Sequence, residues 1–136
     1  MTEDRYQKGW DKIMELTSPD ENHPTGHMDI GEGFKDIAPD LEKYVVEFAF
    51  GDIYARPGID NKQKVLTTIS GLVAQGTPQI EMHIKTGLQV GLTPDEMVGS
   101  IVHLLPYVGF PRVLNALKAA QAVFNEAGVS VTKKQG

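Results

Sequence analysis

Apolar residues recur along this chain at the spacing of amphipathic helices. Between residues 60 and 76 they fall three or four positions apart and therefore share one helical face. That face consists of Val65, Leu66, Ile69, Leu72 and Val73. No segment alternates apolar and polar residues over a strand's length, which is the pattern of a half-buried strand. The chain is predicted to be all-α, with short connections that favour antiparallel neighbours.

Helix start and stop signals divide the chain into about six predicted helices. These cover residues 2–16, 39–56, 60–76, 77–91, 93–108 and 111–128. Residues 18–33 are rich in Pro, Gly, Asp and Asn and are predicted to form one long loop, and residues 129–136 a tail. With 136 residues the chain suits a single domain, 1–136, whose ordered core is expected at about 2–128.

Particular residues mark the ends of these helices. Thr2 and Asp60 are suited to N-capping, and Thr93 with Glu96 forms a capping box, in which side chains and backbone amides at a helix start bond reciprocally. Gly76 supplies a C-terminal stop, and Pro106 is expected to kink or end its helix.

Two of the predicted helices have apolar faces that are expected to pack inward. In the first helix that face consists of Tyr6, Trp10, Ile13 and Met14. In the helix opened by Pro39, which is expected to be deeply buried, it consists of Leu41, Tyr44, Val45, Phe48 and Ile53.

Composition narrows the function classes. The formal charge of −5 and the pI near 5.3 suit a cytoplasmic protein, and no cluster of Lys and Arg is present to follow a phosphate backbone. Nucleic-acid binding is therefore disfavoured. No apolar run reaches the length of a signal peptide's core or of a membrane span, so the protein is expected to be neither secreted nor membrane-spanning.

The sequence contains no cysteine. Disulfides, thiolate metal sites and thiol redox chemistry are therefore excluded.

Two histidines stand on consecutive predicted helices. His83 shares a face with Ile80 and Ile84, so it is expected to point at the core or at a pocket beside it. His103 lies on a helix that is apolar around most of its circumference, as a helix covered on both sides would be, here by a neighbouring subunit. If the two helices form an antiparallel hairpin, both histidines lie roughly 13–16 Å from the turn and nearly level. The alternative for either histidine is a hydrogen-bonded core residue.

A metal site is not expected. His83 and His103 lack a carboxylate at the helical spacing that metal-binding His-Glu motifs show. His23 and His27 flank a turn in the polar loop and are expected to be solvated.

Three further residues are candidate substrate ligands. Arg56 precedes Pro57-Gly58 and could bind a carboxylate through two parallel hydrogen bonds, or simply satisfy carbonyls at the helix end. Tyr107 and Asn115 flank a Gly-Phe-Pro break and could reach into a pocket there, or serve packing and local backbone bonding.

Three blocks of sequence, in this order, resemble the carboxymuconolactone decarboxylase family. They are FGDIYARPGID at 50–60, HIKTGLQVGLT at 83–93 with Asp95-Glu96, and HLLPYVGFPRVLNAL at 103–117. The resemblance runs from about Arg5 to Ala127. It implies the all-helical fold shared with alkylhydroperoxidase D and assembly as a homotrimer or homohexamer.

The absence of cysteine separates the two branches of this family. The redox branch places a Cys-x-x-Cys pair at the positions of Gly76 and Gln79, so a thiol peroxidase relay is excluded here. What remains resembles the decarboxylase branch, which opens γ-carboxymuconolactone to β-ketoadipate enol-lactone without a cofactor. Pro106 and the inserted loop at 22–27 depart from the family pattern, which leaves the substrate open.

The resemblance implies a role for each candidate. His83 is the expected proton donor, His103 its electrostatic or hydrogen-bonding partner, and Arg56 the anchor for a carboxylate, with Tyr107 and Asn115 as further substrate contacts. The expected partners are a small carboxylated substrate and further copies of the chain. The competing hypothesis is a non-catalytic oligomeric binding or accessory protein that retains the fold.

Overall fold

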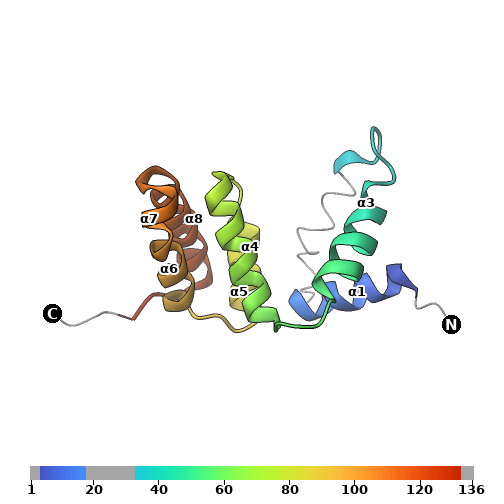
Figure 1. Cartoon of the computed structure of the whole chain (residues 1–136), viewed down its shortest axis with the longest axis horizontal. Helices are drawn as coiled ribbons and strands as arrows, with labels where there is room; N and C mark the ends of the chain where they lie inside the picture. The colour runs from blue at the N-terminus through green and yellow to red at the C-terminus, as the bar shows by residue number, and fades with distance from the viewer. Residues whose placement is uncertain (1–3, 18–32, 133–136) are drawn as a thin grey trace. The chain divides into compact units, whose positions relative to one another are not determined.

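A computed structural model describes residues 4–17 and 33–132 of the chain (Figure 1). These residues contain helices and no strand, which confirms the all-α prediction. Thr2, His23, His27 and most of the predicted loop lie outside the described residues. The chain divides into two compact units, residues 1–59 and 60–136, and each is described by itself.

The first unit contains α1 (Arg5–Leu16), α3 (Leu41–Lys43) and the helix η1 (Tyr44–Tyr54). Asp4 caps α1 by accepting a hydrogen bond from the backbone N–H of Tyr6 at 3.0 Å. The predicted cap at Thr2 is therefore wrong. The carboxylate of Asp4 caps the helix instead, so its first residue is Arg5.

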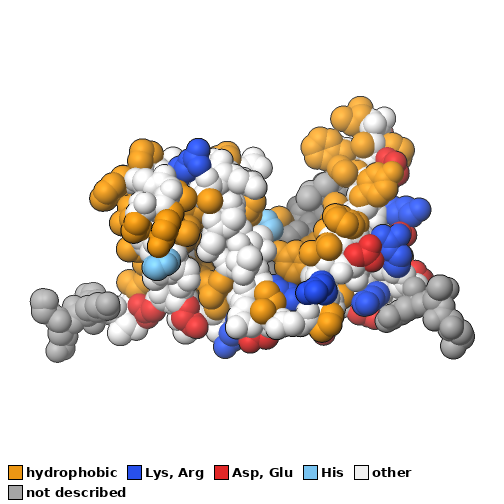
Figure 2. All heavy atoms as spheres, in the orientation of Figure 1, with side chains coloured by type: hydrophobic (Ala, Val, Ile, Leu, Met, Phe, Trp, Pro, Cys, Tyr) orange, Lys and Arg blue, Asp and Glu red, His pale blue; other side chains and the backbone are white. Residues whose placement is uncertain are grey.

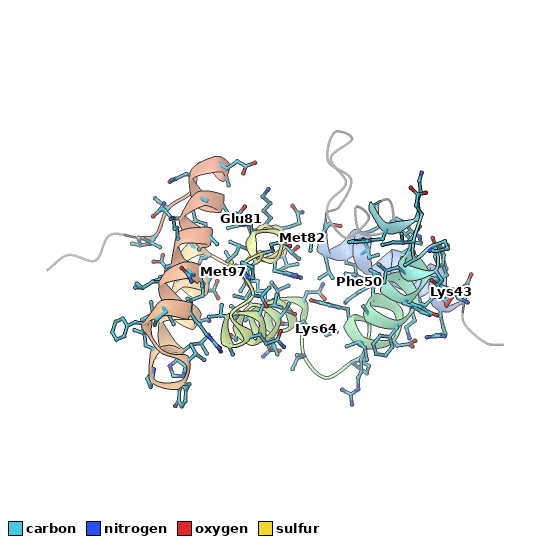
Figure 3. The ribbon with its side chains drawn as sticks, turned by 90° about the horizontal axis from the view of Figure 1, so that it is seen from above. Lys43, Phe50, Lys64, Glu81, Met82 and Met97 are labelled. Atoms are coloured by element: carbon cyan, nitrogen blue, oxygen red, sulfur yellow. The ribbon has the colours of Figure 1, made fainter. Side chains whose placement is uncertain are left out.

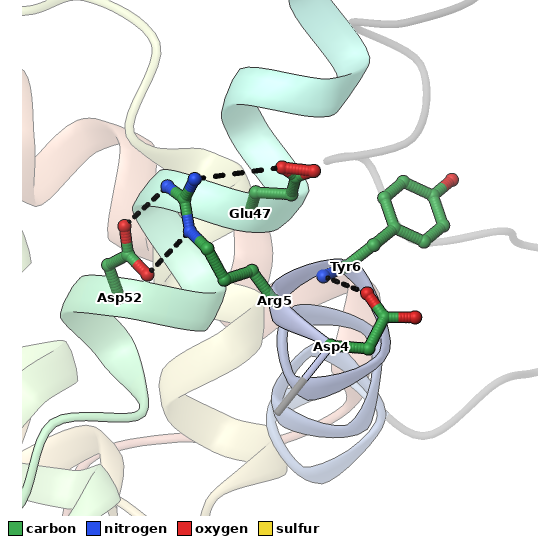
Figure 4. Close-up of polar contacts among 5 residues, drawn as sticks. All are labelled: Asp4, Arg5, Tyr6, Glu47 and Asp52. Carbon is green, nitrogen blue, oxygen red and sulfur yellow. Dashed lines mark hydrogen bonds and ion pairs between the residues drawn. The ribbon is translucent and has the colours of Figure 1, made fainter. Parts of the chain in front are cut away.

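Glycines allow α1 and η1 to approach closely. A Cβ atom on Gly9 would lie 1.8 Å from the carbonyl oxygen of Val46, and one on Gly51 would lie 2.6 Å from the carbonyl oxygen of Arg5. Both distances are far shorter than the van der Waals contact distance between a carbon and an oxygen atom, so neither position has room for a side chain. The same crossing carries an ion pair, in which Arg5 donates to both carboxylate oxygens of Asp52 at 3.1 and 2.6 Å (Figure 4).

The helix η1 is a π-helix, with wider turns than an α-helix. It ends with the backbone N–H of Ala55 donating to the carbonyl of Phe50, five residues back, at 3.0 Å. Its buried residues are Val46, Phe50 and Gly51.

The inward faces predicted for both helices of the first unit need correction. In η1, Phe48 is 57% exposed and Ile53 is 52% exposed, because the wider turns of a π-helix align residues five apart, such as the buried Val46 and Gly51, rather than following the α-helical repeat. In α1 the buried stripe runs through Gly9, Ile13 and Leu16, while the predicted core residue Met14 is 45% exposed.

The second unit contains five helices. They are α4 (Asn61–Gln75), α5 (Glu81–Gln89), α6 (Pro94–His103), α7 (Leu105–Val108) and α8 (Phe110–Ala127). α4 and α8 each pack against the other four helices of this unit (Figures 1 and 3). The buried core consists of Val65, Ile69, Val73, Ile80, Ile84, Leu92, Met97, Ile101, Val113, Ala116, Ala120, Val123 and Phe124.

The predicted helix ends of this unit are largely confirmed. Asp60 and Thr93 each form a capping box, and Gly76 ends α4 in the left-handed conformation at φ 72°. The helix predicted for 93–108 breaks at Leu104, shortly before Pro106, into α6 and α7. The helix predicted from Thr77 begins only at Glu81.

A close contact fixes how α5 meets α6. A Cβ atom on Gly87 would lie 2.6 Å from the sulfur of Met97, so the absence of a side chain at Gly87 makes room for that buried methionine. At the other end of the chain, Thr132 is held by Asp95 at the start of α6, which accepts from the Thr132 hydroxyl at 2.7 Å.

Candidate functional site

The five candidate residues are divided between the two units. Arg56 belongs to the first unit and comes directly after Ala55, the residue that caps the end of η1. Its side chain is exposed and folds back over the turn, where Nη1 donates to the carbonyl oxygen of Pro57 at 3.3 Å. Its guanidinium therefore contacts the backbone at the helix end.

His83 lies in the first turns of α5 and is half-buried. Its neighbours on the helix, Ile80 and Ile84, belong to the core, as the sequence pattern predicts. Burial lowers the pKa of His83 below its ordinary value of 6.5, because the cation loses hydration. The imidazole is therefore neutral at pH 7 and takes up a proton only in more acidic solution.

His103 is the last residue of α6, and its side chain is exposed. Its ring lies 6.0 Å from the ring of Tyr107 between centroids, at an interplanar angle of 48°. Tyr107 is itself 75% exposed. His103 also lines a shallow hollow of about 510 Å³ between α4 and α6, called here the His103 hollow. Its other lining residues are Leu66, Ser70, Asp95, Glu96, Gly99, Ser100 and Leu104.

Asn115 lies on the exposed side of α8 and lines a second hollow, of about 680 Å³, called here the Arg112 hollow. This hollow is bounded by the end of α4, the connection to α5 and one face of α8. Its lining residues are Val73, Gln75, Gly76, Thr77, Pro78, Glu81, Arg112, Asn115, Ala116, Lys118, Ala119 and Ala122.

Of the candidates in the second unit, the structure brings His103 and Tyr107 together and places Asn115 in a different hollow. His83 is not among the residues that line either hollow. No sequence motif marks Arg112 or Lys118, because each is an isolated cation in an acidic chain. Their spacing of three residues on either side of Asn115 is the signal that could have found them.

Residues 4–17 and 33–132 hold no group of three or more His, Asp and Glu side chains arranged for a metal ion. Within the same ranges, no helix combines the length and apolarity that crossing a bilayer requires.

Comparison with known proteins identifies the family. The profile of the carboxymuconolactone decarboxylase family matches residues 39–122, which include every candidate named above. A 4-carboxymuconolactone decarboxylase of Acinetobacter baylyi is 30% identical over 132 residues, which cover 96% of this chain and 95% of that protein. The chain therefore belongs to the carboxymuconolactone decarboxylase family.

Two more relatives match this chain over a smaller part of its length. A nitrosuccinic acid decarboxylase of Metarhizium robertsii is 27% identical over 86 residues, or 62% of this chain and 60% of that protein. An uncharacterized 15.0 kDa protein of Paracoccus denitrificans is 30% identical over 103 residues, or 74% of this chain and 76% of that protein. Two of these three relatives are named as decarboxylases, which supports a decarboxylase-like protein.

Proposed function

We propose that this protein is a cofactor-free carboxy-lyase that removes CO₂ from a small carboxylated lactone of the γ-carboxymuconolactone type. The match to a 4-carboxymuconolactone decarboxylase along nearly the whole of both chains carries this proposal. The absence of cysteine supports the decarboxylase side of the family, because a thiol relay has no residue to use.

The reaction needs one proton and no redox partner. When the carboxylate leaves as CO₂, its bonding electron pair stays on carbon and is delocalised into the conjugated lactone carbonyl as a dienolate. A proton delivered to carbon then gives the product, so that R–COO⁻ and H⁺ become R–H and CO₂. The enzyme must hold the carboxylates, stabilise the dienolate and supply the proton.

His83 is the proposed proton donor. Its position in α5, half-buried among core residues, supplies a fixed imidazole of the kind that general acid catalysis uses. Because burial lowers its pKa, the cation that donates the proton is abundant only in acidic solution. His103 is the proposed hydrogen-bonding or electrostatic partner, and Arg56, Tyr107 and Asn115 are the proposed substrate contacts.

Turnover of a panel of carboxylated lactones, followed by CO₂ release, tests the proposal. In D₂O the wild-type protein should place deuterium on the carbon that lost CO₂, whereas His83→Gln should lose turnover by about 10²–10⁴-fold. Both proteins should keep the same circular dichroism spectrum. If the folded wild-type protein turns over no lactone of the panel, the proposal is contradicted, and the competing hypothesis of a non-catalytic binding protein is favoured.

We also propose that the chain self-associates as a homotrimer or homohexamer. Large apolar side chains around α7 are exposed in the single chain, including Val102, Phe110 and Leu114, at 41%, 65% and 57% (Figure 2). Contiguous apolar surface of this kind is typical of subunit interfaces.

A further inference from the structure

Arg112 joins the start of α8 to the end of α4, just before the connection of residues 76–80 that leads into α5. We propose that Arg112 is a positioning residue for His83, because its bond to α4 fixes the point from which this connection runs to α5 and the imidazole. This role of Arg112 rests on the proposed function of His83 as proton donor, and it requires no contact between Arg112 and the substrate.

The end of α4 leaves one carbonyl group without its usual donor. A carbonyl oxygen in an α-helix accepts from the backbone N–H four residues later. For Ala74 that residue is Pro78, which has no N–H. Nη1 of Arg112 donates to this carbonyl oxygen instead. The side chain of Arg112 therefore supplies a bond that the backbone of the connection cannot make.

Gly76 makes room for this bond. It ends α4 in the left-handed conformation, at φ 72°, which a residue with a side chain rarely adopts. A Cβ atom at this position would lie 3.3 Å from Nε of Arg112 and 3.7 Å from its Cδ and Cζ. The side chain of Arg112 therefore lies against the backbone at the point where the chain leaves α4.

The charge of Arg112 suits the end of α4 better than the start of its own helix. Arg112 stands in the first turn of α8, and that turn contains no acidic residue. A helix carries a partial positive charge at its start and a partial negative charge at its end, so a cation is disfavoured in a first turn and favoured beside a last turn. Ala74 lies in the last turn of α4. The contact between the two helices therefore places this cation where its charge is stabilised.

The start of α5 depends on contacts with other segments, because among the described residues no side chain caps it. Ile80 precedes α5 and makes no capping hydrogen bond through its side chain. Ile80 and Ile84 are buried and hold the first turn by packing, and the N–H of His83 donates to the carbonyl of Ile80 at 3.0 Å. α5 also packs against α8 (Figure 3). A displacement of the end of α4 is therefore passed along a short connection to His83.

Arg112 acts on His83 through the backbone rather than by direct contact. Within the described residues, the hydrogen bond to Ala74 is the polar contact that Arg112 makes, and His83 does not line the Arg112 hollow. A displacement of about 1 Å in a catalytic group can lower a rate by about 100-fold. Partial loosening at the start of α5 should therefore lower turnover without abolishing it.

Steady-state kinetics of lactone decarboxylation separates positioning from substrate binding. Arg112→Gln should lower kcat about tenfold and leave KM within about twofold of the wild-type value, because the imidazole is displaced while the substrate contacts remain. Arg112→Lys, which keeps a cationic donor, should recover kcat to within about threefold of wild type. Lys62→Gln, which removes an exposed cation at the other end of α4, is the charge-matched control and should behave as wild type does. A raised KM with an unchanged kcat for Arg112→Gln would overturn the positioning role, since that result describes a substrate contact.

Two measurements on the folded protein need no turnover. The amides of Thr77 and His83, which donate to backbone carbonyls, should exchange hydrogen about tenfold faster in Arg112→Gln than in wild type, because the connection loses its bond to α8. The pKa of His83, followed through its imidazole resonances, should rise towards its ordinary value of 6.5 as the ring becomes more hydrated. Lys62→Gln should change neither quantity.

Unchanged exchange or an unchanged pKa of His83 in Arg112→Gln would overturn the positioning role. Both quantities are measured without substrate, so failure of this role is distinguished from failure of the proposed decarboxylation.

Discussion

At the residue scale, partial burial gives His83 its chemical character. The desolvation that lowers its pKa also means that charging this imidazole in the folded protein costs free energy. The unfolded chain, whose histidines have a pKa near 6.5, binds that proton more readily. His83 therefore links the free energy of unfolding to pH.

His83→Gln should flatten part of the pH dependence of stability. Below about pH 6.5 the unfolded wild-type protein binds more protons at this position than the folded protein does, so its free energy of unfolding falls as pH falls towards the lowered pKa. Above that pH both states are neutral at His83 and the contribution vanishes. Urea titrations between about pH 5 and pH 8 measure the slope. His103→Gln, at an exposed position, is the control, and identical slopes for His83→Gln and wild type would contradict the prediction.

Gly9→Ala should destabilise the protein by about 3 kcal/mol or more. The new Cβ would meet the Val46 carbonyl oxygen at 1.8 Å, so α1 and η1 must separate. Gly71→Ala is the matched control: it lies inside α4 with no atom within 4 Å of the new Cβ, and it should stabilise by about 0.5–1 kcal/mol through helix propensity. Urea unfolding of both variants makes the comparison. Equal changes in the free energy of unfolding for the two variants would show that the contact between α1 and η1 does not require a glycine at position 9.

At the element scale, local chemistry explains which helix ends were predictable. Asp60, Gly76 and Thr93 act through groups within a few residues of themselves, so the sequence pattern alone located them correctly. The buried face of η1 was not predictable in this way. Its π-helical turns accompany the close crossing with α1 at Gly9 and Gly51, a contact between segments about forty residues apart that an α-helical period does not represent.

Thr93→Ala should lower the free energy of unfolding by about 1 kcal/mol. The substitution removes the hydroxyl that accepts from the Glu96 backbone N–H at 3.1 Å at the start of α6. Thr67→Ala is the same substitution at an exposed position inside α4, where alanine is the better helix former, and it should be neutral or slightly stabilising. If urea unfolding gives the two variants the same stability change, the capping box is not the cause.

At the scale of the whole molecule, the sequence pattern indicates which single residues are candidates, but it does not indicate which of them lie together in the folded chain. The period of α5 correctly predicted that His83 lies beside core residues, whereas His103 is exposed in the single chain. Arg112 and Lys118 share a hollow with Asn115 only because α8 packs beside the end of α4 and the start of α5. Such groupings depend on tertiary packing between helices, which spacing within one helix does not specify.

The proposed self-association should be visible in solution. Light scattering coupled to size-exclusion chromatography should give a mass three or six times that of the 14.9 kDa chain. Leu114→Lys should reduce that mass, because an exposed apolar contact is replaced by a charge that must stay hydrated. Gln89→Lys, an exposed charge substitution on α5, should leave the mass unchanged. A monomeric wild-type protein would contradict the proposal.

In the proposed decarboxylation, His83 delivers the proton to the carbon that loses CO₂. The most direct test is the pH dependence of kcat for CO₂ release from γ-carboxymuconolactone by the wild-type protein. Because the donor is a histidine whose pKa lies below 6.5, the rate should be highest in acidic solution and fall about tenfold per pH unit well above that pKa. A rate that is independent of pH, or that rises between about pH 6 and pH 8, would contradict this role of His83.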